Sequence, residues 1–129
     1  MSHADLEALR AEYEAFSSGH FFLDVHPDFE LKTPDRGIPP NTYCGPEEAR
    51  QAFEDFYEPF EEASVEVEEF FESGDRIVAY FVHRARPRGS SALVEIRAGH
   101  LWTMRDGKPA RLEIFPEREK ALEAAGLSD

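Results

Sequence analysis

The feature that most constrains the fold is residues 92–115, two alternating runs joined by Asp106-Gly107. Asp-Gly between alternating runs is a strong signal for a two-residue β-hairpin turn, because both residues tolerate positive φ angles. Counting outward from this turn places His100 opposite Glu113. The same count gives the further pairs Arg105–Lys108, Met104–Pro109, Trp102–Arg111 and Ala98–Phe115. The sequence therefore predicts a long antiparallel hairpin in which a histidine faces a carboxylate.

One face of the first strand of this hairpin is apolar apart from His100. Side chains alternate across a strand, so this face carries Val94, Ile96, Ala98, His100, Trp102 and Met104. A polar pair on a buried face must be satisfied to be tolerated. Two interpretations stay open: His100 and Glu113 hold the register by a hydrogen bond, or they form a proton-transfer pair at the floor of a pocket.

Size and cysteine content predict a single domain in a reducing compartment. The chain has 129 residues, enough for one core without disulfides, and its only cysteine is Cys44. No apolar run approaches the ~20 residues of a membrane span, and the N-terminal stretch is acidic, unlike a signal peptide. We therefore expect a cytoplasmic protein with no membrane association.

Charge is strongly acidic and unevenly distributed. The formal net charge is −13, and between Glu47 and Asp75 only Arg50 is basic. Nucleic acid is an unsuitable partner, because its binding needs basic patches. The following stretch carries the arginines Arg76, Arg84, Arg86, Arg88 and Arg97. We expect favourable, salt-sensitive contacts between the acidic and basic stretches.

Periodicity outlines the remaining elements. Apolar spacing predicts helices over residues 4–18, from Pro46 onward and over residues 120–127, with a further short helix over 20–25. Alternation predicts a short strand at 29–32 and longer strands at 64–72 and 76–86, with a β-bulge at Glu68-Glu69. Residues 33–41 are rich in proline and should form a loop. This order of elements is typical of an α+β fold with helices covering one face of a curved sheet.

Candidate pocket residues come from the apolar faces of these elements. Tyr13 lies on the buried stripe of the first helix, where its hydroxyl needs a partner. His83 shares the apolar face of His100, either as a satisfied core histidine or as a ligand contact. The aromatic candidates for the pocket wall, with core packing as the default, are Phe16, Phe29, Phe53, Phe56, Tyr57, Phe81, Trp102 and Phe115. No HxH or HExxH spacing suggests zinc, so we expect neither metal nor cofactor.

The chain resembles the SnoaL-like branch of the nuclear transport factor 2-like superfamily. The resemblance spans nearly the whole chain as one domain, residues 1–129. It is carried by Tyr43-x-Gly45, by residues 74–78 (GDRIV), by residues 98–108 (AGHLWTMRDGK) and by residues 119–127 (EKALEAAGL). It implies a conical α+β barrel with about three helices on its concave face, a deep apolar pocket and a homodimer formed through the outer face of the sheet.

The resemblance also implies cofactor-free proton transfer of the cyclase, isomerase or dehydratase type. In the cyclases of this family a carboxylate on the last strand and a histidine on the preceding strand act together, which points to Glu113 and His100. Where ketosteroid isomerases carry their aspartate base this chain has Thr33, so that chemistry is disfavoured. Tyr13 and His100 fall near the isomerases' oxyanion donors. We expect either an enzyme acting on an apolar, carbonyl-bearing small molecule, or a non-catalytic ligand-binding or dimerisation module.

Overall fold

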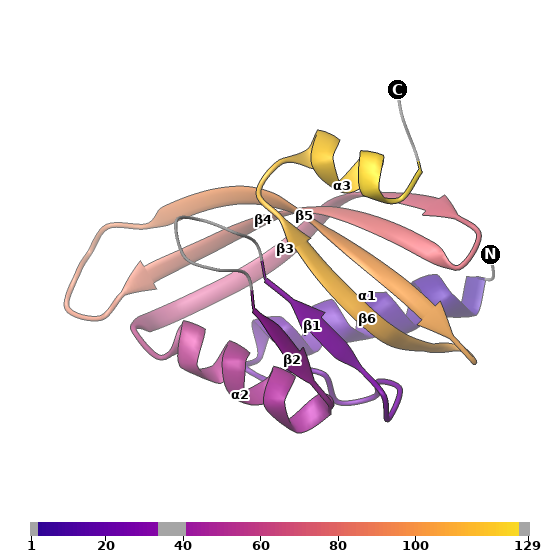
Figure 1. Cartoon of the computed structure of the whole chain (residues 1–129). Coiled ribbons are helices and arrows are strands. Elements are labelled where there is room, and N and C mark those ends of the chain that lie inside the picture. The colour runs from indigo at the N-terminus through magenta and orange to yellow at the C-terminus, as the bar shows by residue number, and fades with distance from the viewer. Residues whose placement is uncertain (1–2, 34–40, 127–129) are drawn as a thin grey trace.

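The computed structural model describes residues 3–33 and 41–126, which form three helices and six strands (Figure 1). The predicted loop over 33–41 lies largely outside the described residues. In chain order the elements are α1 (His3–Ser17), β1 (Glu30–Lys32), β2 (Thr42–Cys44), α2 (Pro46–Tyr57), β3 (Phe60–Ser73), β4 (Arg76–Pro87), β5 (Val94–Arg105), β6 (Lys108–Phe115) and α3 (Arg118–Ala124).

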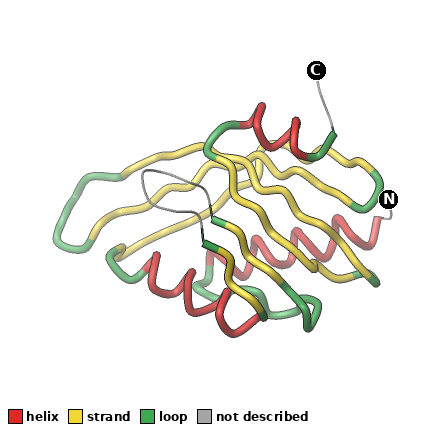
Figure 2. The backbone as a smooth tube through the Cα atoms, viewed as in Figure 1, coloured by secondary structure: helices red, strands yellow, loops and turns green. Residues whose placement is uncertain are grey.

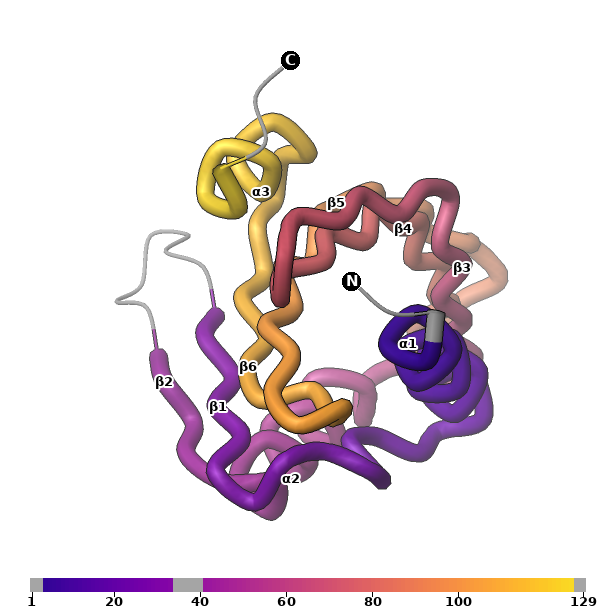
Figure 3. Tube along the Cα trace, turned by 90° about the vertical axis from the view of Figure 1, so that its right-hand side faces the viewer, coloured from indigo at the N-terminus to yellow at the C-terminus, as the bar shows by residue number. Residues whose placement is uncertain are grey.

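The strands form one curved sheet in the order β2-β1-β6-β5-β4-β3. All neighbouring strands are antiparallel except β1 and β6, which are parallel. Figure 2 shows the strands as one layer, and Figure 3 shows that the sheet bends around α1 without closing into a barrel. The predicted α+β class with a curved, mostly antiparallel sheet is confirmed.

The helices divide between the two faces of the sheet. α1 lies in the hollow of the sheet and α2 lies beside the β1–β2 edge (Figure 3). α3 packs on the outer face, where Ala121 and Leu122 join Val78 and Leu101 in a separate buried cluster. Two helices, rather than about three, therefore cover the concave side.

The short segment over residues 20–25 is not helical, and the reason lies in its backbone partners. Phe22 has a positive φ of 54°. The amides of Phe22 and Asp24 donate to the carboxylate of Glu12, which is buried. Arg50 donates to the carbonyls of Phe21 and Phe22. Since side chains from α1 and α2 satisfy these backbone groups, the segment needs no helical hydrogen bonds.

The predicted β-bulge in β3 is confirmed at Glu68, where the pairing with β4 skips one residue between Val67 and Glu69. The bulge lets Val67 and Phe70 both face the core, although they are three positions apart. It leaves Glu66, Glu68 and Glu69 on the outer side.

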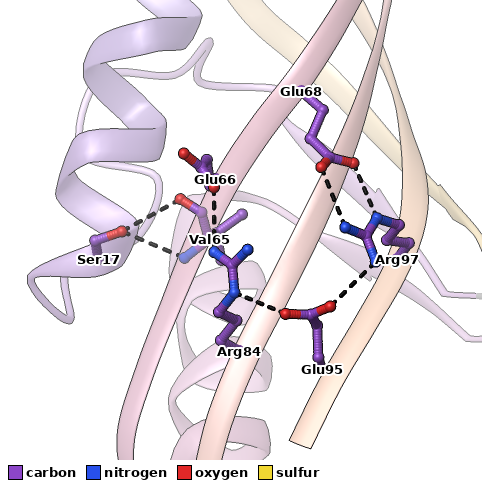
Figure 4. A network of polar contacts seen from close by, with 7 residues as sticks. All are labelled: Ser17, Val65, Glu66, Glu68, Arg84, Glu95 and Arg97. Atoms are coloured by element: carbon purple, nitrogen blue, oxygen red, sulfur yellow. Dashed lines mark hydrogen bonds and ion pairs between the residues drawn. The ribbon is translucent and has the colours of Figure 1, made fainter.

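The expected contacts between the acidic and basic stretches are present on the outer face of β3, β4 and β5. Figure 4 shows Arg84 between Glu66 and Glu95, at 3.1 and 2.9 Å. Arg97 bonds Glu68 and Glu95, at 3.0 and 3.1 Å. The five charged side chains form one exposed network of alternating sign on this face. Dissolved salt should weaken these ion pairs.

Gly99 of β5 lies close against α3. A Cβ at this position would lie 2.8 Å from the Cβ of Ala121. Gly99→Ala should therefore lower the free energy of unfolding by about 1–3 kcal/mol, the range for an overpacked core, as measured by urea denaturation. Adding Ala121→Gly should recover part of this loss, because it removes the clashing methyl group. Unchanged stability of Gly99→Ala would show that α3 is not seated as described.

Candidate functional site

The β5–β6 hairpin turns at Asp106-Gly107 as predicted, but its register shifts by one residue after two pairs. Arg105 pairs with Lys108 and Met104 with Pro109, as predicted, and then Thr103 pairs with Arg111. The predicted pairs His100–Glu113, Trp102–Arg111 and Ala98–Phe115 are therefore wrong. The observed pairs are Leu101–Glu113, His100–Ile114, Trp102–Leu112 and Gly99–Phe115.

A β-bulge at Pro109-Ala110 explains the shift. Proline has no amide hydrogen to donate to a ladder. The Pro109 carbonyl accepts from His26 N at 2.8 Å, and Met104 N donates to the Asp75 carbonyl at 2.8 Å. Because both groups bond outside the hairpin, the ladder resumes one residue later.

The shift moves Glu113 and Phe115 to the outer face. The Glu113 carboxylate lies 3.6 Å from Arg111 Nε, and the residue pairs with Lys32 of β1. Phe115 packs with the cluster under α3. The predicted proton-transfer pair of His100 and Glu113 therefore does not form, and Phe115 is not on the wall of the concave side.

His100 is bonded instead to Tyr13, within a buried chain of three polar groups. The Tyr13 hydroxyl lies 2.7 Å from His100 Nδ1, and Trp102 Nε1–H donates to the same hydroxyl at 2.8 Å. All three side chains are buried. The helix α1 supplies Tyr13, and β5 supplies His100 and Trp102, which share a face because they are two positions apart. Sequence reasoning identified the three residues and the hydroxyl's need for a partner, but not their connection.

Burial keeps the side chains of His100 and Tyr13 uncharged. Desolvation, with a smaller contribution from His83, lowers the pKa of His100 to about 3. Desolvation raises the pKa of Tyr13 well above its usual value. The Tyr13 oxygen accepts from Trp102, so the hydroxyl donates its one hydrogen to Nδ1 of His100. His100 then carries its proton on Nε2, which has no hydrogen-bond partner among the described residues.

Most of the predicted wall residues fill the interior around this chain. Phe16 packs against Tyr13 with ring centres 5.4 Å apart, and Phe81 lies 4.0 Å from His100. Phe53 joins this cluster through Phe16 at 5.6 Å. Phe29 is packed against Phe22 at 4.9 Å, whereas Phe56 is 57% exposed.

A groove of about 630 Å³ lies where the ends of α1 and α2 meet the first half of β3. Its aromatic wall consists of Phe16, Phe21, Tyr57 and Phe60, and its polar lining includes Ser17, Ser18 and Ser64. Phe16 lines the groove and also packs against Tyr13. Burial raises the pKa of Tyr57, so its hydroxyl stays protonated. Sequence reasoning missed Phe21, whose position depends on the non-helical segment described above.

Glu12 is the buried acid in this region that the sequence did not single out. Desolvation raises its pKa despite the two amides that bond its carboxylate. Because both oxygens are engaged by the backbone of residues 22 and 24, Glu12 holds that segment in place. Within the described ranges there is no group of three metal-ligating side chains. No described helix is both long and apolar enough to cross a membrane.

Comparisons with known proteins agree with the fold. The family model of the SnoaL-like domain matches residues 13–112. Among curated proteins, none matches the sequence. The crystal structure of TerC co-crystallised with polyporic acid is similar, with a TM-score of 0.76, 24% identity and coverage of 95% of this chain and 98% of TerC.

Two further solved structures share the fold. An NTF2-like protein of unknown function from Burkholderia pseudomallei has a TM-score of 0.70 and 23% identity, covering 95% of this chain and 97% of its own. A protein from Catenulispora acidiphila with a ketosteroid isomerase-like fold, in complex with trimethylamine, has a TM-score of 0.71 and 13% identity, covering 98% and 95%. At these identities the similarity concerns the fold alone.

Proposed function

The chain belongs to the SnoaL-like domain family, and we propose that it binds a small, mostly apolar molecule whose carbonyl oxygen is polarised by His100 and Tyr13. The family includes polyketide cyclases and isomerases. The observation that carries the proposal is the buried hydrogen-bond chain from Trp102 through Tyr13 to His100. The three side chains form a polar chain, with all hydrogen bonds pointing one way, inside an aromatic interior. A few placed polar groups in an apolar interior are the usual composition of a small-molecule site.

The chemistry follows from the direction of the hydrogen bonds. Each donor in the chain polarises the next, so the Nε2–H of a neutral His100 becomes a stronger donor. A neutral imidazole can stabilise the negative charge that develops on a carbonyl oxygen when a neighbouring carbon loses its proton. His100 has too low a pKa in the free protein to act as a good base. We therefore assign it the polarising role, on substrates whose C–H group is already acidic enough for water to take the proton.

A non-catalytic ligand carrier is the second candidate, and one observation favours it. The strand position opposite His100 carries Ile114 rather than a carboxylate. A site that binds a carbonyl without a base positioned there could hold its ligand without changing it.

Deuterium exchange distinguishes the two candidates. The probe 2-tetralone is an apolar ketone with exchangeable hydrogens beside its carbonyl, and its exchange in D₂O is followed by ¹H NMR. We expect the wild type to accelerate exchange and His100→Gln to lose at least ~100-fold of that acceleration, the lower range for one positioned polarising group. Binding without acceleration would favour the carrier, and no binding would contradict both.

Binding itself can be read at Trp102, the only tryptophan. Its single indole N–H signal reports directly on the bond to Tyr13. Ligand binding at the proposed site should shift this signal for 2-tetralone and for polyporic acid, the compound co-crystallised with TerC. Tyr57→Phe is the matched control, since it removes a hydroxyl from the groove wall and leaves the chain of three intact.

We also propose that the protein acts as a homodimer through the outer face of its sheet, in the cytoplasm. The network of Arg84, Arg97 and their three glutamates offers alternating charges that a second copy could pair with (Figure 4). The single, exposed Cys44 suits a reducing compartment. Light scattering should give twice the chain mass, and Arg97→Glu should halve it. A wild-type mass equal to one chain would contradict the dimer.

A further inference from the structure

His83, in β4, is the second histidine on the concave face of the sheet. Its Nε2 atom is buried and has no hydrogen-bond partner among the described residues. The residue is only 7% exposed. Native proteins satisfy nearly all buried polar side-chain atoms, because an unpaired one destabilises the fold. An unpaired nitrogen at this place therefore indicates a partner that binds there.

The rings and strand neighbours that pack around His83 are mostly apolar. The rings of Phe56, Tyr57 and Phe60 lie 6.1, 5.2 and 6.2 Å from its ring centre. Its neighbours across the sheet are Val65 and Ile96. Burial lowers the pKa of His83, so the imidazole is neutral.

The apolar surface around His83 continues to solvent at the open end of the concave side. Phe56, on the last turn of α2, is 57% exposed, and Val94 and Ile96 of β5 are 40% and 44% exposed. Figure 1 shows the β4–β5 hairpin extending beyond α2 at this end. Phe56 is the more exposed of the two phenylalanines that pack against His83, so it can move away from His83 with the smaller loss of packing.

Charge and hydrogen bonding narrow the class of ligand. The chain has a net charge of −13, and the arginines on this part of β4 are already paired. Arg84 bonds Glu66 and Glu95, and Arg86 bonds Glu61 and Glu62. An anionic ligand would find no free cation among these residues. A hydroxyl group suits a neutral imidazole in either tautomer, because it can both donate and accept.

We propose that His83 Nε2 binds a hydroxyl group of an uncharged, aromatic or alicyclic ligand at the open end of the concave face. The inference rests on the proposed function and extends it to a ligand with a hydroxyl in addition to its carbonyl. Ala79 pairs with His100 and lies four residues before His83. His83 and His100 are thus offset by about 13 Å along the strand direction, counted on the backbone.

The test compares 2-naphthol with naphthalene, which lacks the hydroxyl, in wild type and in His83→Phe, with affinities taken from NMR titration. We expect the wild type to prefer 2-naphthol by about tenfold, the equivalent of one hydrogen bond. His83→Phe keeps a ring and removes both nitrogens, so it should bind the two compounds equally and melt at a higher temperature. His83→Leu, which also lacks the nitrogen, should give the same loss of preference.

A control variant tests whether the hydroxyl is recognised by His83 or by the phenol beside it. The Tyr57 ring lies 5.2 Å from the His83 ring, and Tyr57→Phe should keep the preference for 2-naphthol. A preference that survives in His83→Phe and disappears in Tyr57→Phe would overturn the assignment to His83 and leave the binding function intact. Equal wild-type affinities for the two compounds would overturn it as well. Failure of both compounds to bind would overturn the proposed binding function, and this inference with it.

Discussion

Replacing Tyr13 by phenylalanine should destabilise the protein by about 2–4 kcal/mol. The substitution removes the acceptor of Trp102 Nε1–H and the donor to His100 Nδ1, and it leaves both groups buried. Each unpaired buried group costs about 1–3 kcal/mol, and the lost hydroxyl leaves little space for water to replace it. Urea denaturation measures the loss, and the indole N–H signal of Trp102 should move upfield in the folded variant.

Tyr57→Phe is the matched control for this prediction. It removes the same atom from a largely buried tyrosine, but the Tyr57 hydroxyl has no hydrogen-bond partner among the described residues and borders the groove. Its stability should change by less than about 0.5 kcal/mol, as is usual for substitutions that break no specific contact. Equal losses in the two variants would show that the Tyr13 bonds contribute nothing beyond packing.

The fold was predictable from local patterns because those patterns repeat over long segments. The Asp-Gly turn and the alternation on either side predicted the hairpin, and the phase break at Glu68-Glu69 predicted the bulge. Residues 20–25 were assigned wrongly because their conformation depends on Glu12 and Arg50, which lie elsewhere in the sequence. Apolar periodicity carries no information about such tertiary partners of the backbone.

The candidate site was predictable in its members and not in its pairing. Alternation placed His100, Trp102 and His83 on one face, and helical spacing placed Tyr13 toward them. The pairing of His100 with Glu113 was predicted wrongly because one unpaired residue, Ala110, changes the face of every residue beyond it. Pro109 was the available signal, since proline next to a hairpin turn favours such a bulge.

The buried state of His100 should make stability fall steeply as the solution becomes acidic. The folded pKa is about 3, whereas an unfolded histidine titrates near 6.5. Between these values the unfolded chain binds the proton and the folded chain does not, so stability is greatest above pH ~6.5 and decreases toward pH 3. The slope from His100 alone is about 1.4 kcal/mol per pH unit, or about 2 kcal/mol lost between pH 6.5 and 5.

His100→Gln isolates this contribution from that of the many carboxylates. Glutamine can still accept the Tyr13 hydrogen bond and cannot be protonated, and the carboxylates of the two proteins are the same. The free energy of unfolding, from urea titrations at pH 7, 6 and 5, should therefore fall less steeply with decreasing pH in the variant. The slopes should differ by about 1.4 kcal/mol per pH unit, the effect of one bound proton. His83, whose pKa is also lowered by burial, should leave a remaining dependence of the same sign. Parallel curves for the two proteins would contradict this prediction. They would mean that His100 is protonated in the folded protein, although its Nδ1 accepts from Tyr13 in a buried site.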